Sequence, residues 1–120
     1  MGRDPTDSKA TLKKTCDLIA LLSTGKSFRL EDISEIHFDK GYGFTLFTAL
    51  GGVPVKLGSS AFEEKLGRLS RIYQDLKGQM PGLVYIDLDF GDKIIVKSNS
   101  TLSFFIVAHI RRHRLYRKVL

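Results

Sequence analysis

The sequence is poor in residue types that characterise several protein classes. It contains one cysteine, three prolines and no tryptophan among 120 residues. A single cysteine, Cys16, excludes an intrachain disulfide, and its helical spacing with Leu12 and Ile19 predicts a buried, unreactive thiol. Apolar runs such as Phe104 to Ala108 are far shorter than the ~20 residues of a membrane-spanning helix. The N-terminal stretch lacks the apolar segment of a secretory signal. We therefore expect no disulfide scaffold and no segment that enters or crosses a membrane.

Acidic residues are missing from the last twenty positions, and this absence accounts for most of the net charge of +6. Residues 1–100 carry 14 basic against 13 acidic side chains, so this part of the chain is nearly neutral. The remaining basic residues lie in the tail, at Arg111, Arg112, Arg114, Arg117 and Lys118. Such a charge run is usually a solvated face, and no nucleic-acid-binding motif accompanies it. Contact of these five residues with nucleic acid or another anionic surface is therefore the alternative hypothesis.

The remaining composition is that of one globular domain, with 42% apolar and 27% charged residues. The apolar patterns follow the order helix, three strands, helix, two strands. This order predicts an α+β fold, in which a mostly antiparallel sheet of about five strands carries two helices on one face. A C-terminal helix or strand is expected to follow. We expect residues 1–100 to form the domain and residues 101–120 an apolar-basic segment whose role the sequence leaves open.

Both helices are predicted from apolar stripes with the period of an α-helix. The first begins at Asp7 or Ser8, ends before Gly25 and should bury the stripe Leu12, Cys16, Ile19 and Leu22. The second begins with a capping box, Ser60 to Glu63, and Gly78 closes it. Its apolar face consists of Phe62, Leu66, Leu69, Tyr73 and Leu76.

The strands between the helices are predicted from alternating apolar and polar residues. A loop at residues 39–43 should place Phe38 opposite Phe44, and Gly51-Gly52 should form a two-residue hairpin loop that places Leu46 opposite Leu57. Because proline cannot donate to a strand ladder, Pro54 predicts that the third strand lies at an edge or contains a bulge.

The last hairpin, Val84 to Lys97, shows the same alternation. Four residues of its first strand should face inward, namely Val84, Ile86, Leu88 and Phe90. Ile94 and Val96 join the inner face only if the loop has an odd number of residues, such as Gly91 to Lys93. That loop would place Leu88 opposite Val96.

Side chains that could carry catalysis or hold a metal are few and poorly grouped. Asp87 and Asp89 are closely spaced outward carboxylates, but without a nearby His or third acid they predict a solvated strand face, with Lys97 opposite Asp87. His109 and His113 have the spacing of metal ligands on a helix, yet no Cys or carboxylate lies near them in sequence. We therefore expect no catalytic residue, no metal site and no cofactor.

Two stretches of the sequence resemble a known family. They are VKLGS at Val55 to Ser59, which runs into FEEKLGRL at Phe62 to Leu69, and YIDLDF at Tyr85 to Phe90, which precedes IIVK at Ile94 to Lys97. They resemble the membrane-distal domain of the bacterial cell-division family FtsQ/DivIB, in which a V-x-L-G strand leads into a helix and then into a Y-x-D-L hairpin. The segment Ile33 to Leu50 is similar to the I-S-E-I segment of the same family. The resemblance covers roughly Lys9 to Lys97.

The resemblance implies a role without catalysis and without a small-molecule substrate. It implies a divisome scaffold that contributes to septum formation by binding FtsB, and through it FtsL, when a partner segment adds to the last strand. It also implies a place on the periplasmic face of the cytoplasmic membrane at the division site. The membrane helix and the POTRA domain of the family are not found in this sequence, so we expect the chain itself to be soluble.

The implied binding site is the edge and outer face of the last hairpin. An exposed last strand offers unpaired N–H and C=O groups to an added strand, while alternate side chains supply selectivity. Lys93 and Lys97 would pair with acidic residues of the partner, and Tyr85 would be an aromatic anchor. The site residues are Tyr85, Asp87, Lys93, Ile95 and Lys97. A tail that covers this edge would close the site.

Overall fold

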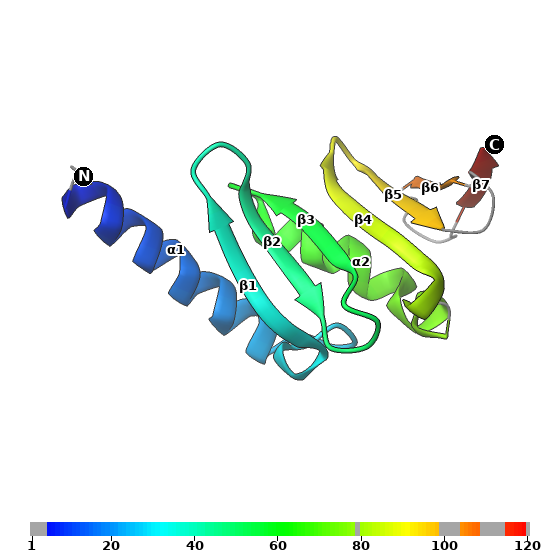
Figure 1. The fold of residues 1–120 in the computed structure, drawn as a ribbon, viewed down its shortest axis with the longest axis horizontal. Coiled ribbons are helices and arrows are strands. Elements are labelled where there is room, and N and C mark those ends of the chain that lie inside the picture. The colour runs from blue at the N-terminus through cyan, green and yellow to red at the C-terminus, as the bar shows by residue number, and fades with distance from the viewer. Residues whose placement is uncertain (1–4, 79, 99–103, 109–114, 120) are drawn as a thin grey trace.

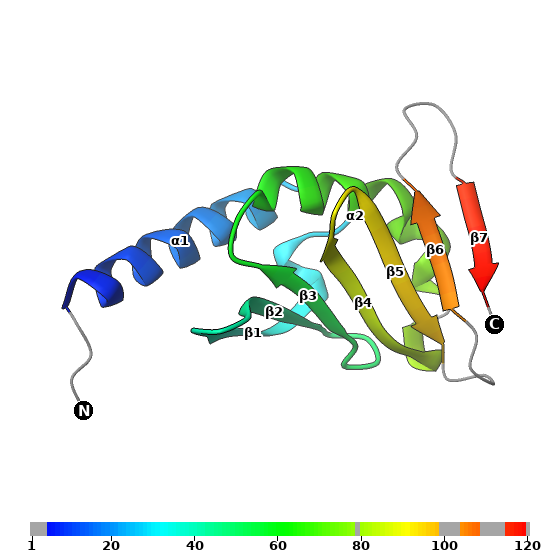
Figure 2. The same cartoon turned by 90° about the horizontal axis from the view of Figure 1, so that it is seen from above.

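The computed structural model describes residues 5–78, 80–98, 104–108 and 115–119. Within these ranges the chain forms one sheet with both long helices on the same side of it (Figures 1 and 2). The elements are α1 (Pro5–Ser23), the 3-10 turn η1 (Leu30–Asp32), β1 (Ile33–Asp39), β2 (Gly43–Thr48), β3 (Pro54–Gly58), α2 (Phe62–Lys77), the 3-10 turn η2 (Met80–Gly82), β4 (Leu83–Phe90), β5 (Lys93–Ser98), β6 (Phe104–Ala108) and β7 (Leu115–Val119). The predicted α+β class and element order are confirmed, and the C-terminal segment contributes strands.

The strands of the described residues lie in the sheet in their sequence order, from β1 at one edge to β7 at the other. Neighbouring strands are antiparallel except for β3 and β4, which are parallel. Parallel neighbours cannot be joined by a tight turn, so the chain crosses over through α2, which contacts β4. This crossover places β4 and β5 beside the β1–β3 meander, so that β3, β4 and β5 all lie in front of α2 in Figure 1.

The hairpin between β1 and β2 has the predicted register. Phe38 lies opposite Phe44, and Ile36 lies opposite Leu46. The carboxylate of Asp39 accepts hydrogen bonds from two backbone N–H groups of the connecting loop, at 2.8 and 2.9 Å. These bonds satisfy loop donors that the ladder cannot reach, and they hold the turn in place.

The predicted two-residue loop between β2 and β3 is wrong. Leu46 lies opposite Val55 instead of Leu57, and the backbone N–H of Thr48 donates to the carbonyl of Val53 at 3.1 Å. The Thr48 hydroxyl accepts a bond from the Val53 N–H at 2.8 Å and donates to a loop carbonyl at 2.7 Å. Because one side chain satisfies both loop groups, a wider loop over residues 49–52 is stable, and the register shifts by two residues.

The predicted edge position of β3 is also wrong, since β3 lies between β2 and β4. Pro54 is tolerated in this interior strand because it is the first residue, where proline disturbs the ladder least. The alternative prediction of a bulge is confirmed at the other end of the strand pair. There the register shifts between Phe44 and Thr45, opposite Gly58.

The register of β4 and β5 also differs by two residues from the prediction. Ile86, and not Leu88, lies opposite Val96. The turn contains two residues, because Phe90 pairs with Lys93, and an irregularity between Asp87 and Phe90 absorbs the odd residue. Ile94 and Val96 are nevertheless buried on the inner face, as predicted.

The two ends of β4 depart from the predicted facing. Val84 and Phe90 were expected inside, yet they are 39% and 53% exposed, whereas Ile86 and Leu88 are fully buried. Register irregularities flank the central part of β4 on both sides. Such irregularities turn the chain and redirect side chains at strand ends, so the alternation holds only in the middle of the strand.

Helix α1 buries one residue of the predicted stripe and misses the others. Leu22 is buried as predicted, but Leu12, Cys16 and Ile19 are exposed, and Leu18 is buried in addition. The core-facing positions 11, 15 and 18 each precede a predicted position by one residue, which is a rotation of about 100° around the helix. Two of these positions are threonines, which conceal the stripe in the sequence. The Thr15 hydroxyl donates to the carbonyl of residue 11 at 2.8 Å and so tolerates partial burial.

Helix α2 has the predicted apolar face but not the predicted cap. Leu66, Leu69, Tyr73 and Leu76 are buried, and Gly78 ends the helix. The capping box is wrong, because the N-cap is residue 61, in a left-handed conformation, and no side chain caps the helix there. Two glutamates in the first turn place negative charge at the positive end of the helix dipole instead.

The core lies between the inner face of β2–β5 and the two helices. All buried apolar side chains of the described residues belong to one cluster. Its largest members include Tyr73, Phe28, Phe44, Leu18, Leu22, Leu46, Leu57, Leu69, Met80, Ile86, Leu88 and Ile94. Among the described residues, both long helices lie on one face of the sheet and leave the opposite face open (Figure 2). This open face and the sheet edge are where a macromolecular partner could contact the backbone and side chains of several strands at once.

Candidate partner-binding site

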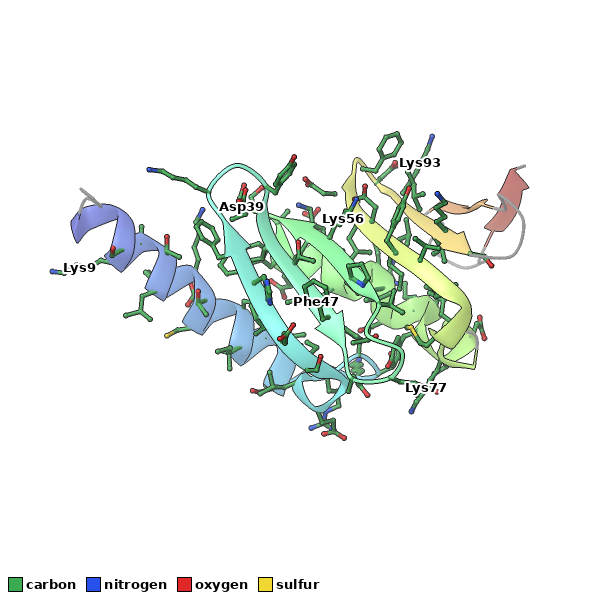
Figure 3. All side chains as sticks on the ribbon, viewed as in Figure 1. Lys9, Asp39, Phe47, Lys56, Lys77 and Lys93 are labelled. Atoms are coloured by element: carbon green, nitrogen blue, oxygen red, sulfur yellow. The ribbon has the colours of Figure 1, made fainter. Side chains whose placement is uncertain are left out.

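Four of the five predicted site residues form one cluster on the open face of the sheet. Tyr85 lies opposite Lys97, and Asp87 lies opposite Ile95, on the adjacent strands β4 and β5. All four are half-buried, and they alternate with the fully buried Ile86 and Val96, so they face away from the helices. We call Tyr85, Asp87, Ile95 and Lys97 the outer patch. Lys93, the fifth residue, is exposed at the turn end of β5 (Figure 3).

Lys56 of β3 extends the outer patch, and the sequence reasoning did not include it. Its ammonium nitrogen lies 4.5 Å from the centroid of the Tyr85 ring, and Lys56 pairs with Asp87 in the parallel ladder. A lysine at this distance is attracted to the face of the ring. Its alternation with Val55 and Leu57 indicates an outward side chain, but only the crossover through α2 reveals that β4 is the neighbour of β3.

A second aromatic pair lies on the same open face, on the side of β1 and β2. The ring centroids of His37 and Phe47 are 4.9 Å apart, and Phe47 is half-buried although no helix covers it. Figure 3 shows Phe47 and Lys56 on the side of the sheet that faces away from α2. The open face thus carries aromatic and aliphatic side chains between charged ones, from β1 to β5.

Asp89 is exposed, as predicted for a solvated strand face, but it also has a structural partner that the sequence did not reveal. Its Oδ1 atom accepts a bond from the ammonium group of Lys65 at 2.8 Å, and the same ammonium group donates to the carbonyl of Leu57 at 2.9 Å. Lys65 is buried in helix α2, and the Asp89 side chain is 54% exposed. Asp87 is also engaged, because it accepts a bond from the backbone N–H of Asp89. Its predicted neighbour Lys97 lies opposite Tyr85 instead.

No group of three or more His, Cys, Asp and Glu side chains that could hold a metal ion exists among the described residues. His109 and His113 lie outside the described residues, as do Arg111, Arg112 and Arg114. Arg117 and Lys118 belong to β7, but their side chains are outside the described part of the chain. The anionic contacts predicted for this tail therefore remain a prediction.

The predicted binding edge of β5 is not free. Strand β6 lies antiparallel along it, in a register that runs from Lys93 opposite Ala108 to Lys97 opposite Phe104. The apolar, β-branched and aromatic residues of β6 favour strand pairing, and β6 follows β5 closely in sequence. The chain thus satisfies the hydrogen-bonding groups of its own edge, and β7 becomes the last strand of the sheet.

The fold and the outer patch together define a small α+β domain with one open sheet face. A family model described as "Cell division protein FtsQ/DivIB, C-terminal" matches residues 4–89, which is well over half of the chain. The chain belongs to the FtsQ/DivIB family of cell-division proteins. The resemblance read from the V-x-L-G and Y-x-D-L segments is thereby confirmed.

Named relatives agree with this family. The chain is 58% identical over 97 residues to the cell division protein FtsQ of Geotalea daltonii and 59% identical over 97 residues to that of Geobacter sp. strain M21. It is 39% identical over 96 residues to the FtsQ of Syntrophotalea carbinolica. These matches cover 80–81% of the chain but only 33–35% of each relative, so the chain spans about a third of their length. None of these names points to nucleic acid.

Proposed function

We propose that this chain is a non-enzymatic scaffold domain of a bacterial cell-division protein, which binds partner division proteins by strand addition along β5. The observation that carries the proposal is the outer patch, since half-buried aromatic, aliphatic and charged side chains lie together beside the edge of β5. Backbone groups of β5 would supply affinity for an extended segment, and the outer patch would select its side chains. Membership of a cell-division family supports the same role.

The partners are proposed to be division proteins of the FtsB and FtsL type, as the family resemblance implies. Tyr85 would be the anchor, because its ring combines large contact area with a neighbouring lysine that partly covers it. Lys93 and Lys97 would attract acidic residues of the partner and accelerate association. The resulting assembly would contribute to septum formation.

The proposed place of action is the periplasmic face of the cytoplasmic membrane at the division site. Among the described residues, no helix has both the length and the apolar character needed to cross a membrane. The family resemblance supplies a membrane helix and a POTRA domain on the N-terminal side, and the relatives are about three times as long as the matched region. In the arrangement that the resemblance implies, attachment to the membrane would come from that membrane helix and not from α1 or α2.

The substitution Tyr85→Ala tests the proposed anchor. We expect it to weaken binding of a purified FtsB-type protein from Geotalea daltonii about thirtyfold, which corresponds to the ~2 kcal/mol typical of an aromatic anchor. Isothermal titration calorimetry at constant ionic strength measures the change. The control is Leu12→Ala, because Leu12 is 64% exposed on helix α1, on the side of the sheet that the helices occupy. Equal affinities of the two variants would reject Tyr85 as an anchor.

A further inference from the structure

The edge of β5 has a resident strand in this chain. The pairing of β6 with β5 spans five residues of each strand, from Lys93–Ala108 to Lys97–Phe104. A partner strand that added along β5 would need the same row of backbone N–H and C=O groups. Two strands cannot pair with one edge at the same time, so β6 and such a partner exclude each other.

Strands β6 and β7, here called the C-terminal strand pair, are attached to the domain through a single ladder. Strand β6 pairs with β5 and β7 pairs with β6, so the ladder between β5 and β6 connects the pair to the rest of the sheet. An isolated two-stranded unit is only marginally stable. The C-terminal strand pair can therefore separate from β5 by breaking one ladder, while the other strands of the sheet stay paired.

The family model ends before the C-terminal strand pair. It matches residues 4–89, and both β5 and the C-terminal strand pair lie beyond that range. Strand β5 nevertheless contributes Ile94 and Val96 to the core cluster. It is therefore held to the domain by buried side chains as well as by its ladder with β4.

We propose that the C-terminal strand pair is an internal competitor that keeps the partner-binding edge of β5 closed until it separates. This inference rests on the proposed function, because it regulates the same edge. The apparent affinity for a partner is then lower than the intrinsic affinity by the fraction of chains in which β5 is open. If that fraction is about 0.1–10%, opening the edge should tighten binding between about tenfold and a thousandfold.

Hydrogen exchange of the whole chain tests the first part, without any partner. Successive residues of a strand point their N–H groups to opposite neighbours, so one of Phe105→Pro and Ile106→Pro must remove a bond to β5. We expect exchange of β5 amides to rise at least tenfold in that variant, while amides of β2 and α2 keep their protection. The control is Leu115→Pro, at the first residue of β7, where proline is tolerated and removes no bond to β5. Unchanged β5 protection in both variants would overturn the inference.

Binding of the purified FtsB-type protein from Geotalea daltonii tests the second part. The variant with an open β5 should bind it at least tenfold more tightly than the unmodified chain, and Leu115→Pro should bind like the unmodified chain. If the proline variants lose protection in β2 and α2 as well, the milder Ile106→Gly, which keeps the backbone donor, replaces them. Unchanged affinity in a variant whose β5 edge is open would show that β6 does not compete with the partner. The result of Tyr85→Ala would then decide whether strand addition at β5 is kept or rejected. Absence of binding in every variant, with β5 open, would reject the proposed function itself.

Discussion

At the scale of single residues, the pair of Lys65 and Asp89 connects helix α2 to the strand that carries the outer patch. The ammonium group of Lys65 is buried and contacts both Asp89 and the carbonyl of Leu57, so it joins α2 to β3 and β4. A buried charge is costly unless it is paired. The pair therefore fixes the position of β4 relative to the helix that crosses beneath it.

The first stability prediction concerns Asp89. Replacement by alanine leaves the buried ammonium group of Lys65 without its carboxylate, and we expect the free energy of unfolding to fall by about 1–3 kcal/mol. Urea denaturation followed by circular dichroism measures the change. Asp92→Ala is the matched control, since Asp92 is exposed in the β4–β5 turn, and it should alter stability by less than about 0.5 kcal/mol. Equal losses in the two variants would contradict a structural role of the ion pair.

The second stability prediction concerns Tyr73. Burial, and then the nearby carboxylate of Asp32, raise the pKa of the Tyr73 phenol above its ordinary value of 10.0. The same carboxylate accepts a hydrogen bond from the phenol. In the folded protein the phenol holds its proton more tightly than in the unfolded chain. Its contribution to stability is thus complete below pH 10 and is lost as the pH rises toward the higher folded-state pKa. Tyr73→Phe should cost about 1 kcal/mol at pH 7, and this difference from the wild type should shrink above pH 10. A difference that is independent of pH, measured by urea denaturation, would refute the linkage.

At the scale of elements, the pairing of β2 with β3 depends on close approach of two backbone segments. Gly43 has φ +88°, and a Cβ atom on it would collide with the backbone carbonyl group of Gly58. Gly58 in turn has φ +82°, and a Cβ atom there would lie 2.7 Å from the Asp89 carboxylate. Both glycines stand where the strand pair ends in a bulge. The bulge therefore requires residues without a side chain on both strands.

This crowding predicts different costs for two glycine substitutions. Gly43→Ala combines a left-handed backbone with a collision against backbone atoms that cannot move aside, so we expect a loss of about 3 kcal/mol or more of unfolding free energy. Gly52→Ala has the same kind of backbone, with φ +60°, but open space around the added methyl group, so only about 1–2 kcal/mol should be lost. Thermal and urea denaturation of the pair separate conformational strain from steric overlap. A Gly43→Ala loss no larger than that of Gly52→Ala would show that the strands separate easily.

At the scale of the whole molecule, the domain is a two-layer structure with a covered and an open side. The helices lie on one side of the sheet (Figure 2). The residues of the outer patch alternate with the buried Ile86 and Val96 and so lie on the other side, where a contact need not disturb the core. The patch also borders the edge of β5. Strand β5 thus carries core side chains, the outward side chains of the outer patch and the backbone edge that β6 occupies.

The sequence by itself determined which side faces the core in the middle of β2, β3, β4 and β5, because alternation has a period of two residues. At the ends of β4 the alternation fails, since Val84 and Phe90 are exposed. It also determined the element order, the family, and the apolar face of α2. Both register errors, at Leu46 and at Ile86, are shifts by two residues. A shift by two residues does not itself move a side chain to the other face of the sheet, and the pattern therefore cannot detect it. The outer patch was predictable as a set of outward residues for the same reason.

Only the tertiary structure decided which contacts those faces make. The stripe that α1 buries depends on the position of the sheet beneath it, since Leu12 and Leu18 are equally apolar in the sequence. The approach of Lys56 to Tyr85 depends on the parallel neighbour created by the crossover. The apolar segment Phe104–Ala108 could form a helix or a strand as far as its sequence shows. It pairs with β5 because the edge of β5 lies within its reach in the folded chain. Each of these outcomes is set by packing between segments that are distant or independent in sequence, where local patterns carry no information.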